Sequence, residues 1–193
     1  MTTAFDQDPI NNAINLGIRR DIDIAIENEC FRSATILILC AIDTMTFLAM
    51  REGRDNVQRS DFVGWADKYV RFSGKEQLTG MDLYGARCAM LHNYGLRSKL
   101  SREGQCRVIL WMDRSRPPIK SHPTLPNYVL VAITGLRDAV FAGMDRFFIE
   151  ICSDRLSKKA KLVEERLKTL VQQMPADTVM RSGDSTSTEY GSR

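Results

Sequence analysis

Arg87, His92 and Tyr94 are the residues of this chain whose types and spacing could do chemistry together. They lie in the segment DLYGARCAMLHNYG, residues 82–95. Its apolar residues recur at helical spacing and Gly95 is a typical helix stop, so the pattern predicts a helix over residues 80–94. His92 therefore belongs to the last turn, where the partial negative charge of the helix end favours a protonated imidazole.

The helical geometry limits how these side chains can cooperate. At roughly 100° per residue, Arg87 and His92 point about 140° apart, while Arg87 and Tyr94 are nearly eclipsed. Arg87 and His92 can still meet on one ligand, either in a cleft at the helix edge or across a two-fold axis that joins two copies. A guanidinium, an imidazole and a phenol around one helix end suit a phosphate group.

The sequence RCAMLHNY, residues 87–94, resembles the Arg-x4-His-x-Tyr signature of HEPN-domain proteins. Those proteins are small helical bundles, and many are metal-independent endoribonucleases that act as toxins or in antiviral defence. They commonly dimerise, so that the motifs of two subunits form one site. The resemblance covers residues 9–95 and the helix after 127. Cys88 departs from the polar residue often found after the arginine, and residues 96–127 have no assigned counterpart.

The resemblance implies a role for each motif residue. Arg87 and His92 would be the catalytic pair. Asn93 beside them, and Asp43 as a candidate counter-charge for Arg87 outside the motif, are the expected supporting residues. His92 would move the proton when the 2′-hydroxyl of RNA attacks the adjacent phosphate, and Arg87 would stabilise the developing charge. Tyr94 would be the acceptor of AMP from a nucleotidyltransferase antitoxin. The resemblance implies no cofactor, and the expected partners are RNA and a second copy of the chain.

Structural alternatives stand beside these roles. Arg87 can pair with Asp43 or Asp82, His92 can cap its own helix end, and Tyr94 can fill the edge of a bundle. The chain would then be a non-catalytic helical module that binds a partner. A metal site is not expected, because the five cysteines form no C-x-x-C pair that would complete a site with His92.

A basic segment follows the motif. Residues 97–120 contain seven basic residues against two acids, although the whole chain carries only +3. Such a segment attracts a polyanion by counterion release, and Trp111 offers a face on which a base can stack. Alternatively, the loop is merely solvated and Trp111 belongs to the core. The candidate RNA contacts are Arg97, Lys99, Arg102 and Arg107.

The hydrophobic pattern predicts an all-α bundle of about five helices. The stretch 31–50 is apolar on nearly every side, which predicts the central helix, and its single acid, Asp43, needs a partner such as Arg87. Residues 106–112 predict a short strand, followed by a proline-rich loop, and the chain becomes helical again from 127. The remaining expected helices span residues 9–28, 60–72, 80–94 and 153–175. One domain of residues 1–174, with a basic insertion at 97–127, precedes a disordered polar tail at 175–193.

Composition indicates an ordinary globular domain. The 193 residues are 44% hydrophobic and 26% charged, which is enough for one core. The amino terminus lacks the basic residues and apolar run of a signal peptide, and the apolar stretch 34–42 is too short to span a bilayer. These features predict a cytoplasmic protein with reduced thiols.

Overall fold

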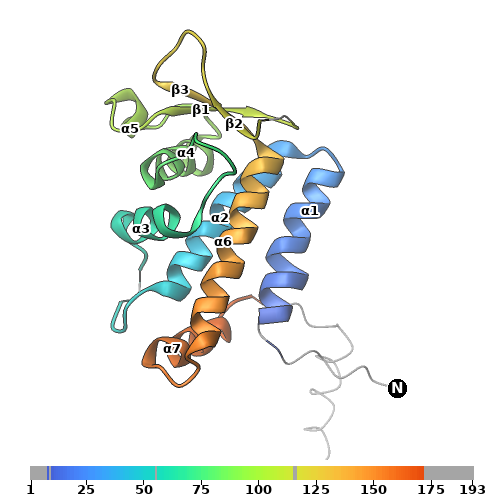
Figure 1. The fold of residues 1–193 in the computed structure, drawn as a ribbon, viewed down its shortest axis with the longest axis vertical. Coiled ribbons are helices and arrows are strands. Elements are labelled where there is room, and N and C mark those ends of the chain that lie inside the picture. The colour runs from blue at the N-terminus through green and yellow to red at the C-terminus, as the bar shows by residue number, and fades with distance from the viewer. Residues whose placement is uncertain (1–7, 9, 55, 115–116, 172–193) are drawn as a thin grey trace, which may run out of the picture.

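The computed structural model describes residues 8, 10–54, 56–114 and 117–171. The expected tail at 175–193 lies outside this range. The first element of the described residues is a π-type helical segment that runs directly into the first α-helix, and Figure 1 shows how the elements are arranged. The elements are η1 (Ile10–Arg19), α1 (Arg20–Glu27), α2 (Phe31–Ala49), α3 (Arg59–Tyr69), α4 (Gly80–Asn93), α5 (Lys99–Arg102), β1 (Val108–Met112), β2 (Ile119–Ser121), β3 (Tyr128–Ala132), α6 (Ile133–Ser153) and α7 (Lys158–Leu167).

Helix α2 is the centre of the bundle, as its sequence predicts. It packs against α1, α3, α4, α6 and α7, and Ile38, Leu39, Ile42 and Met45 are fully buried. By length and composition alone α2 could cross a membrane, but half of its apolar stretch is buried inside the fold. Its hydrophobicity therefore matches its position, since a helix that contacts neighbours on most sides has little polar surface to present.

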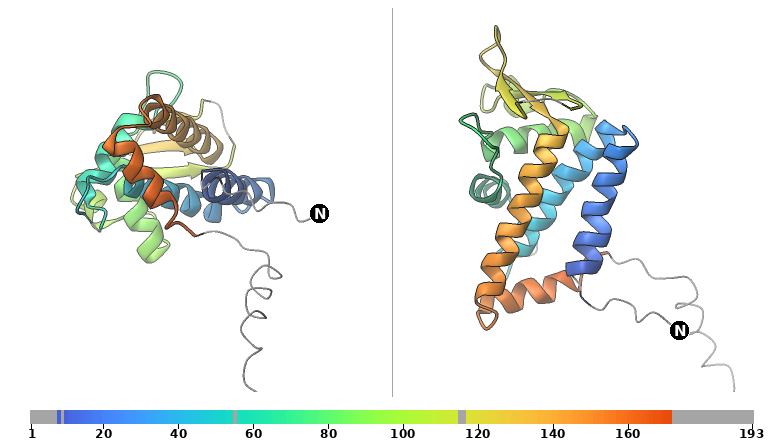
Figure 2. Two further views of the ribbon diagram at one scale, coloured as in Figure 1. Left: turned by 90° about the horizontal axis from the view of Figure 1, so that it is seen from below. Right: turned by 45° about the vertical axis from the view of Figure 1, so that its right-hand side comes forward.

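Three short strands form a sheet that covers one end of the bundle (Figures 1 and 2). The strand order is β1-β3-β2. β1 pairs with β3 in parallel, with Val108 opposite Tyr128, and β2 pairs with β3 antiparallel, with Ile119 opposite Val131. The sheet packs on α4 through β1 and continues into α6 through β3. It thereby holds the motif helix α4 against the bundle.

The fold is mostly helical, as expected. The expectation of an all-α fold is wrong at residues 128–132, which form a strand. The helix expected from residue 127 begins only at Ile133, because Tyr128–Ala132 forms the central strand β3. Two neighbouring strands satisfy the backbone of β3, and its Val129 and Val131 side chains are fully buried. The proline-rich loop also contains β2. The expected short strand at 106–112 is confirmed as β1.

The last two helices separate where the sequence suggested a break. α6 ends at Ser153, and the Ser157 hydroxyl accepts a hydrogen bond from the backbone N–H of Ala160 to cap α7. α7 ends at Leu167, several residues before the expected end near 175. The two helices pack together and on α2, so α7 closes the end of the bundle opposite the sheet (Figure 1).

Candidate functional site

Arg87 of α4 and Asp43 of α2 form the ion pair that the lone acid of α2 suggested. The Nε of Arg87 lies 2.5 Å from Oδ2 of Asp43, and both side chains are about one quarter exposed (25% and 24%). Burial raises the pKa of Asp43, against the opposing effects of the Arg87 hydrogen bond and charge. Burial opposes the charge of Arg87, but the hydrogen bond and charge of Asp43 outweigh it, so the pKa of Arg87 is raised. The guanidinium therefore stays charged.

The ion pair uses only part of the Arg87 guanidinium. Nε donates to Asp43, whereas Nη1 and Nη2 make no hydrogen bond to any residue that the structure describes. The guanidinium carbon lies 5.7 Å from the centre of the Tyr84 ring, which supports its plane from one side. Asp43 and Tyr84 thus hold a partly exposed fork whose two terminal nitrogens are free to bind an anion.

His92 is exposed in the last turn of α4. It makes no hydrogen bond or ion pair within residues 8–171 as described, so it does not cap its helix with its side chain. The neighbouring Asn93 is also exposed. Arg87 pairs with Asp43 on α2. His92 follows five residues later, so its side chain points about 140° away from that of Arg87 around the helix axis. Among the described residues, no contact joins Arg87 to His92, and the helix directs their side chains to different sides.

Tyr94 ends α4 in a left-handed backbone conformation, with φ of 51°. Its N–H donates to the Met90 carbonyl at 3.1 Å, and the N–H of Gly95 donates to the Ala89 carbonyl at 2.9 Å. The helix stops where the sequence indicated, but the left-handed residue is the tyrosine and not Gly95. The Tyr94 side chain is 59% exposed, and its hydroxyl has no hydrogen-bond partner among the described residues.

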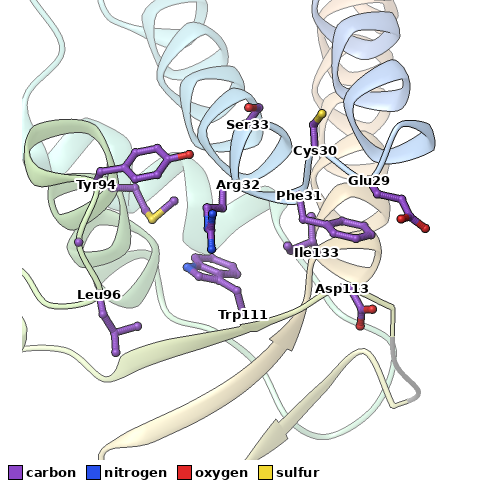
Figure 3. Close-up of a pocket in the computed structure, with 12 residues that line it drawn as sticks. Glu29, Cys30, Phe31, Arg32, Ser33, Tyr94, Leu96, Trp111, Asp113 and Ile133 are labelled. Atoms are coloured by element: carbon purple, nitrogen blue, oxygen red, sulfur yellow. The ribbon is translucent and has the colours of Figure 1, made fainter.

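A cavity of about 700 Å³ lies beside Tyr94 (Figure 3). Phe31 and Arg32 from the start of α2 line it, together with Trp111 of β1 and Ile133 of α6. Its volume is in the range of small-molecule binding sites. The sequence indicated Tyr94 and Trp111 as separate candidates, but it gave no sign that the start of α2 faces them, because these segments are far apart along the chain.

Three of the four candidate basic contacts remain at the surface. Arg97, Lys99 and Arg102 are exposed. The Arg97 guanidinium lies 5.4 Å from the centre of the Tyr128 ring, and the ammonium group of Lys99 lies 3.7 Å from Glu103 in a weak surface pair. These side chains can still reach a polyanion. Arg116, which also contributes to the basic charge of the segment, lies outside the described residues.

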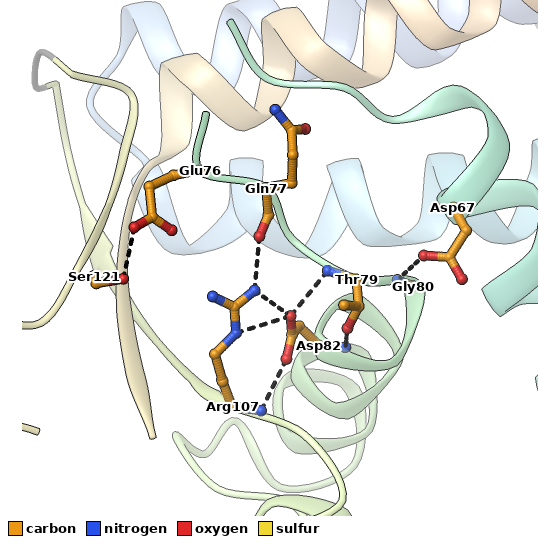
Figure 4. Close-up of polar contacts among 8 residues, drawn as sticks. All are labelled: Asp67, Glu76, Gln77, Thr79, Gly80, Asp82, Arg107 and Ser121. Carbon is orange, nitrogen blue, oxygen red and sulfur yellow. Dashed lines mark hydrogen bonds and ion pairs between the residues drawn. The ribbon is translucent and has the colours of Figure 1, made fainter. Parts of the chain in front are cut away.

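The fourth candidate, Arg107, is engaged inside the fold (Figure 4). Its Nη2 donates to Oδ2 of Asp82 at 2.6 Å and to the Gln77 carbonyl at 2.7 Å, and its backbone N–H donates to Oδ1 of Asp82 at 2.8 Å. Asp82 is almost fully buried and also accepts from the N–H of Thr79 at 2.9 Å. Burial raises the pKa of Asp82, but the hydrogen bonds from Arg107 and the backbone outweigh this and leave it lowered. The structure thus gives Arg107 a role in attaching the sheet to α4.

The other histidine, His122, has an internal role. Its Nδ1 accepts hydrogen bonds from the backbone N–H groups of Thr124 at 3.3 Å and Leu125 at 3.1 Å, which shapes the loop before β3. Within the part of the chain that the structure describes, no three His, Cys, Asp or Glu side chains are grouped so that they could hold a metal ion. His92 is therefore the histidine with the accessible, unbonded ring.

No family model, curated protein or solved structure matches this chain.

Proposed function

We propose that this protein is a metal-independent endoribonuclease of the HEPN type that acts as a dimer. One observation carries the proposal: Asp43 holds Arg87 through Nε alone, which leaves both terminal nitrogens unbonded within the described chain, and an exposed His92 follows five residues later without a partner. The two terminal nitrogens of Arg87 are thus available to a phosphate, and the ring of His92 is available to exchange a proton, which are the two roles that the reaction requires.

In the proposed reaction the 2′-hydroxyl oxygen of a ribose attacks the adjacent phosphorus. A bond from O2′ to phosphorus forms as the bond from phosphorus to O5′ breaks. The His92 imidazole takes the 2′-hydroxyl proton and, once protonated, gives a proton to the leaving O5′. Arg87 donates from Nη1 and Nη2 to the phosphate oxygens, where negative charge accumulates in the transition state. The products are a 2′,3′-cyclic phosphate and a 5′-hydroxyl, and DNA resists cleavage because it lacks the 2′-hydroxyl.

The separation of Arg87 and His92 within one copy favours a site built from two copies. A two-fold axis near the end of α4 would bring the His92 of each chain toward the Arg87 of the other. The exposed Arg97, Lys99 and Arg102 follow directly after the motif and would surround such a site with positive charge. Their attraction for phosphates predicts RNA binding that weakens as salt rises.

The test is cleavage of a labelled single-stranded RNA in EDTA by the wild type, His92→Ala and His122→Ala, prepared side by side. His122 is the matched control, because its ring bonds only to its own loop. We expect the wild type and His122→Ala to cleave and leave cyclic phosphate ends, and His92→Ala to lose at least about 100-fold in rate. Equal cleavage by wild type and His92→Ala would refute the proposal. No cleavage by the wild type dimer would favour the alternative of a non-catalytic binding module.

The exposed phenol of Tyr94 also favours a second proposal, that of a toxin inactivated by modification. The Tyr94 oxygen would attack the α-phosphorus of ATP, with pyrophosphate as the leaving group, in a reaction catalysed by a nucleotidyltransferase partner. We expect a mass increase of one AMP unit, or a multiple of it, on co-expression with such a partner, and no increase for Tyr94→Phe. Modification that persists in Tyr94→Phe would exclude this residue as the acceptor.

A further inference from the structure

The cavity beside Tyr94 is lined by aromatic side chains from three separate elements. Phe31 comes from α2, Tyr94 from the end of α4 and Trp111 from β1 (Figure 3). All three remain accessible: Phe31 and Trp111 are partly exposed, and Tyr94 is 59% exposed. Aromatic faces that line an open hollow, and do not pack fully into the core, are suited to stacking on a flat ring.

Charged groups also line the cavity, with Arg32 near Tyr94 and Trp111 and with Glu29 and Asp113 on the side of Phe31 (Figure 3). Arg32 is exposed on the cavity wall, and it makes no hydrogen bond or ion pair with any described residue. Its guanidinium can therefore take a phosphate without breaking an existing contact. Glu29 and Asp113 also line the cavity, and their carboxylates can accept hydrogen bonds from the exocyclic amino group of a base. The wall thus offers flat apolar faces, one cation and two acceptors.

The backbone around the cavity is also unusual. Among the described residues, Glu29 and Tyr94 are the only non-glycine residues with positive φ, at 57° and 51°, and both line this cavity. Side chains rarely adopt this conformation without compensation from the surrounding structure. The fold thus holds strained backbone on both sides of the same hollow.

We propose that this cavity binds one unpaired nucleotide of a single-stranded RNA. Its base stacks on Trp111 and Tyr94, and Arg32 binds its phosphate. The cavity volume of about 700 Å³ is sufficient for a nucleotide. This inference rests on the proposed function, because Tyr94 follows His92 by two residues and so links the cavity to the cleavage motif. The cavity would then select the nucleotide next to the cleaved bond.

The test is binding of a fluorescently labelled, unstructured RNA in EDTA, measured by anisotropy in a His92→Ala background so that the RNA stays intact. Removing a stacking aromatic weakens single-strand binding by between about fivefold and 150-fold, and we expect Trp111→Ala to fall in that range. Arg32→Ala should weaken binding at least about threefold and reduce its salt dependence. Trp111→Phe keeps a stacking ring and should restore most of the affinity, which distinguishes a lost contact from a folding defect.

Two matched controls lie away from the cavity. Arg51 is an exposed arginine just beyond the opposite end of α2, and Phe148 is a partly buried phenyl group on α6. We expect Arg51→Ala and Phe148→Ala to bind RNA as the parent does. Parental affinity in both Trp111→Ala and Arg32→Ala would overturn the inference. Trp111-dependent binding of free AMP or UMP without binding of the RNA would also overturn it, in favour of a free-nucleotide site.

The same variants with His92 intact separate this inference from the nuclease proposal. If the cavity holds the substrate, Trp111→Ala and Arg32→Ala raise KM for RNA more than they lower kcat. Binding that depends on Trp111 in a protein that cleaves no RNA would support the cavity as a nucleotide site and remove the nuclease proposal. Cleavage with the same KM and kcat in both variants as in the parent would support the nuclease proposal and remove the cavity as a site for the substrate.

Discussion

At the scale of residues, the motif divides into one side chain that the fold holds and two that it leaves exposed. Asp43 orients Arg87, while His92 and Tyr94 are open to solvent at the end of α4. The sequence alone suggested the Asp43 pairing, because a lone acid in an apolar helix needs a counter-charge. It could not show that Arg107 is engaged by Asp82, since a basic residue in a basic segment resembles its exposed neighbours until the fold is known.

Replacing Asp43 by Asn should lower the free energy of unfolding. The Arg87 charge would remain partly buried without its counter-ion, and we expect a loss of about 1–3 kcal/mol in the free energy of unfolding, below the range for fully buried pairs because this pair is one quarter exposed. Urea unfolding of Asp43→Asn, Arg87→Gln and the double variant measures the coupling. If the losses of the two single variants add exactly to the loss of the double variant, the ion pair contributes nothing to the free energy of unfolding.

The left-handed backbone of Tyr94 predicts an order of stability among its variants. Glycine tolerates positive φ and alanine does not, so Tyr94→Gly should be more stable than Tyr94→Ala by about 1 kcal/mol. Gly95, which lacks positive φ, provides the comparison, and Gly95→Ala should change stability little because its added Cβ meets only ordinary contacts. Thermal unfolding of the three variants checks this order, and a more stable Tyr94→Ala would contradict it.

At the scale of elements, the long helices and strand β1 followed from the local pattern, whereas strands β2 and β3 and the short helix α5 did not. α2 and α4 begin and end within a residue or two of their expected bounds, since apolar spacing and stop residues are local signals. β3 was missed because its apolar run YVLVA joins α6 with no turn residue between Ala132 and Ile133. Its strand conformation depends on pairing with β1, and such long-range contacts leave no local pattern.

The attachment of the sheet to α4 predicts a large effect of Asp82→Asn. The change removes the buried negative charge opposite the Arg107 guanidinium, and we expect a loss of about 2–4 kcal/mol, because Asp82 is almost fully buried while Arg107 is about one quarter exposed. Lys99→Ala, which breaks the exposed pair with Glu103, should cost less than about 1 kcal/mol. Urea unfolding compares the two, and similar small losses would show that Asp82 does not stabilise the attachment.

Glu150 connects three helices and predicts a pH dependence of stability. Hydrogen bonds from Lys159, Lys68 and Tyr69 lower its pKa from 4.5 to about 2. A lowered pKa contributes stability that is fully present above the ordinary value and is lost as pH falls toward the folded value. Glu150→Gln should therefore be less stable than wild type at neutral pH, with the difference shrinking between pH 4.5 and 2. A difference that stays constant through acid titration would contradict this.

At the scale of the whole molecule, the proposal places each active centre between two copies of the chain. Arg87 and His92 point to different sides of α4, so in the proposed dimer Arg87 would come from one copy and His92 from the other. In the same proposal, the cavity at the start of α2 would hold the neighbouring nucleotide, and the exposed basic residues after the motif would attract the phosphate backbone. The sequence indicated the motif and the basic segment, but the cavity arises only when α2, α4 and β1 come together.

The most direct test of this account is RNA cleavage by a mixed dimer of Arg87→Ala and His92→Ala. The two variants would carry different affinity tags, be co-expressed and be purified through both tags, with doubly tagged wild type as the positive control. The account predicts that each variant alone is inactive and that the mixed dimer regains up to about half of the wild-type activity, because one of its two centres pairs an intact Arg87 with an intact His92. A mixed dimer as inactive as its parents, beside an active wild type, would contradict a shared site.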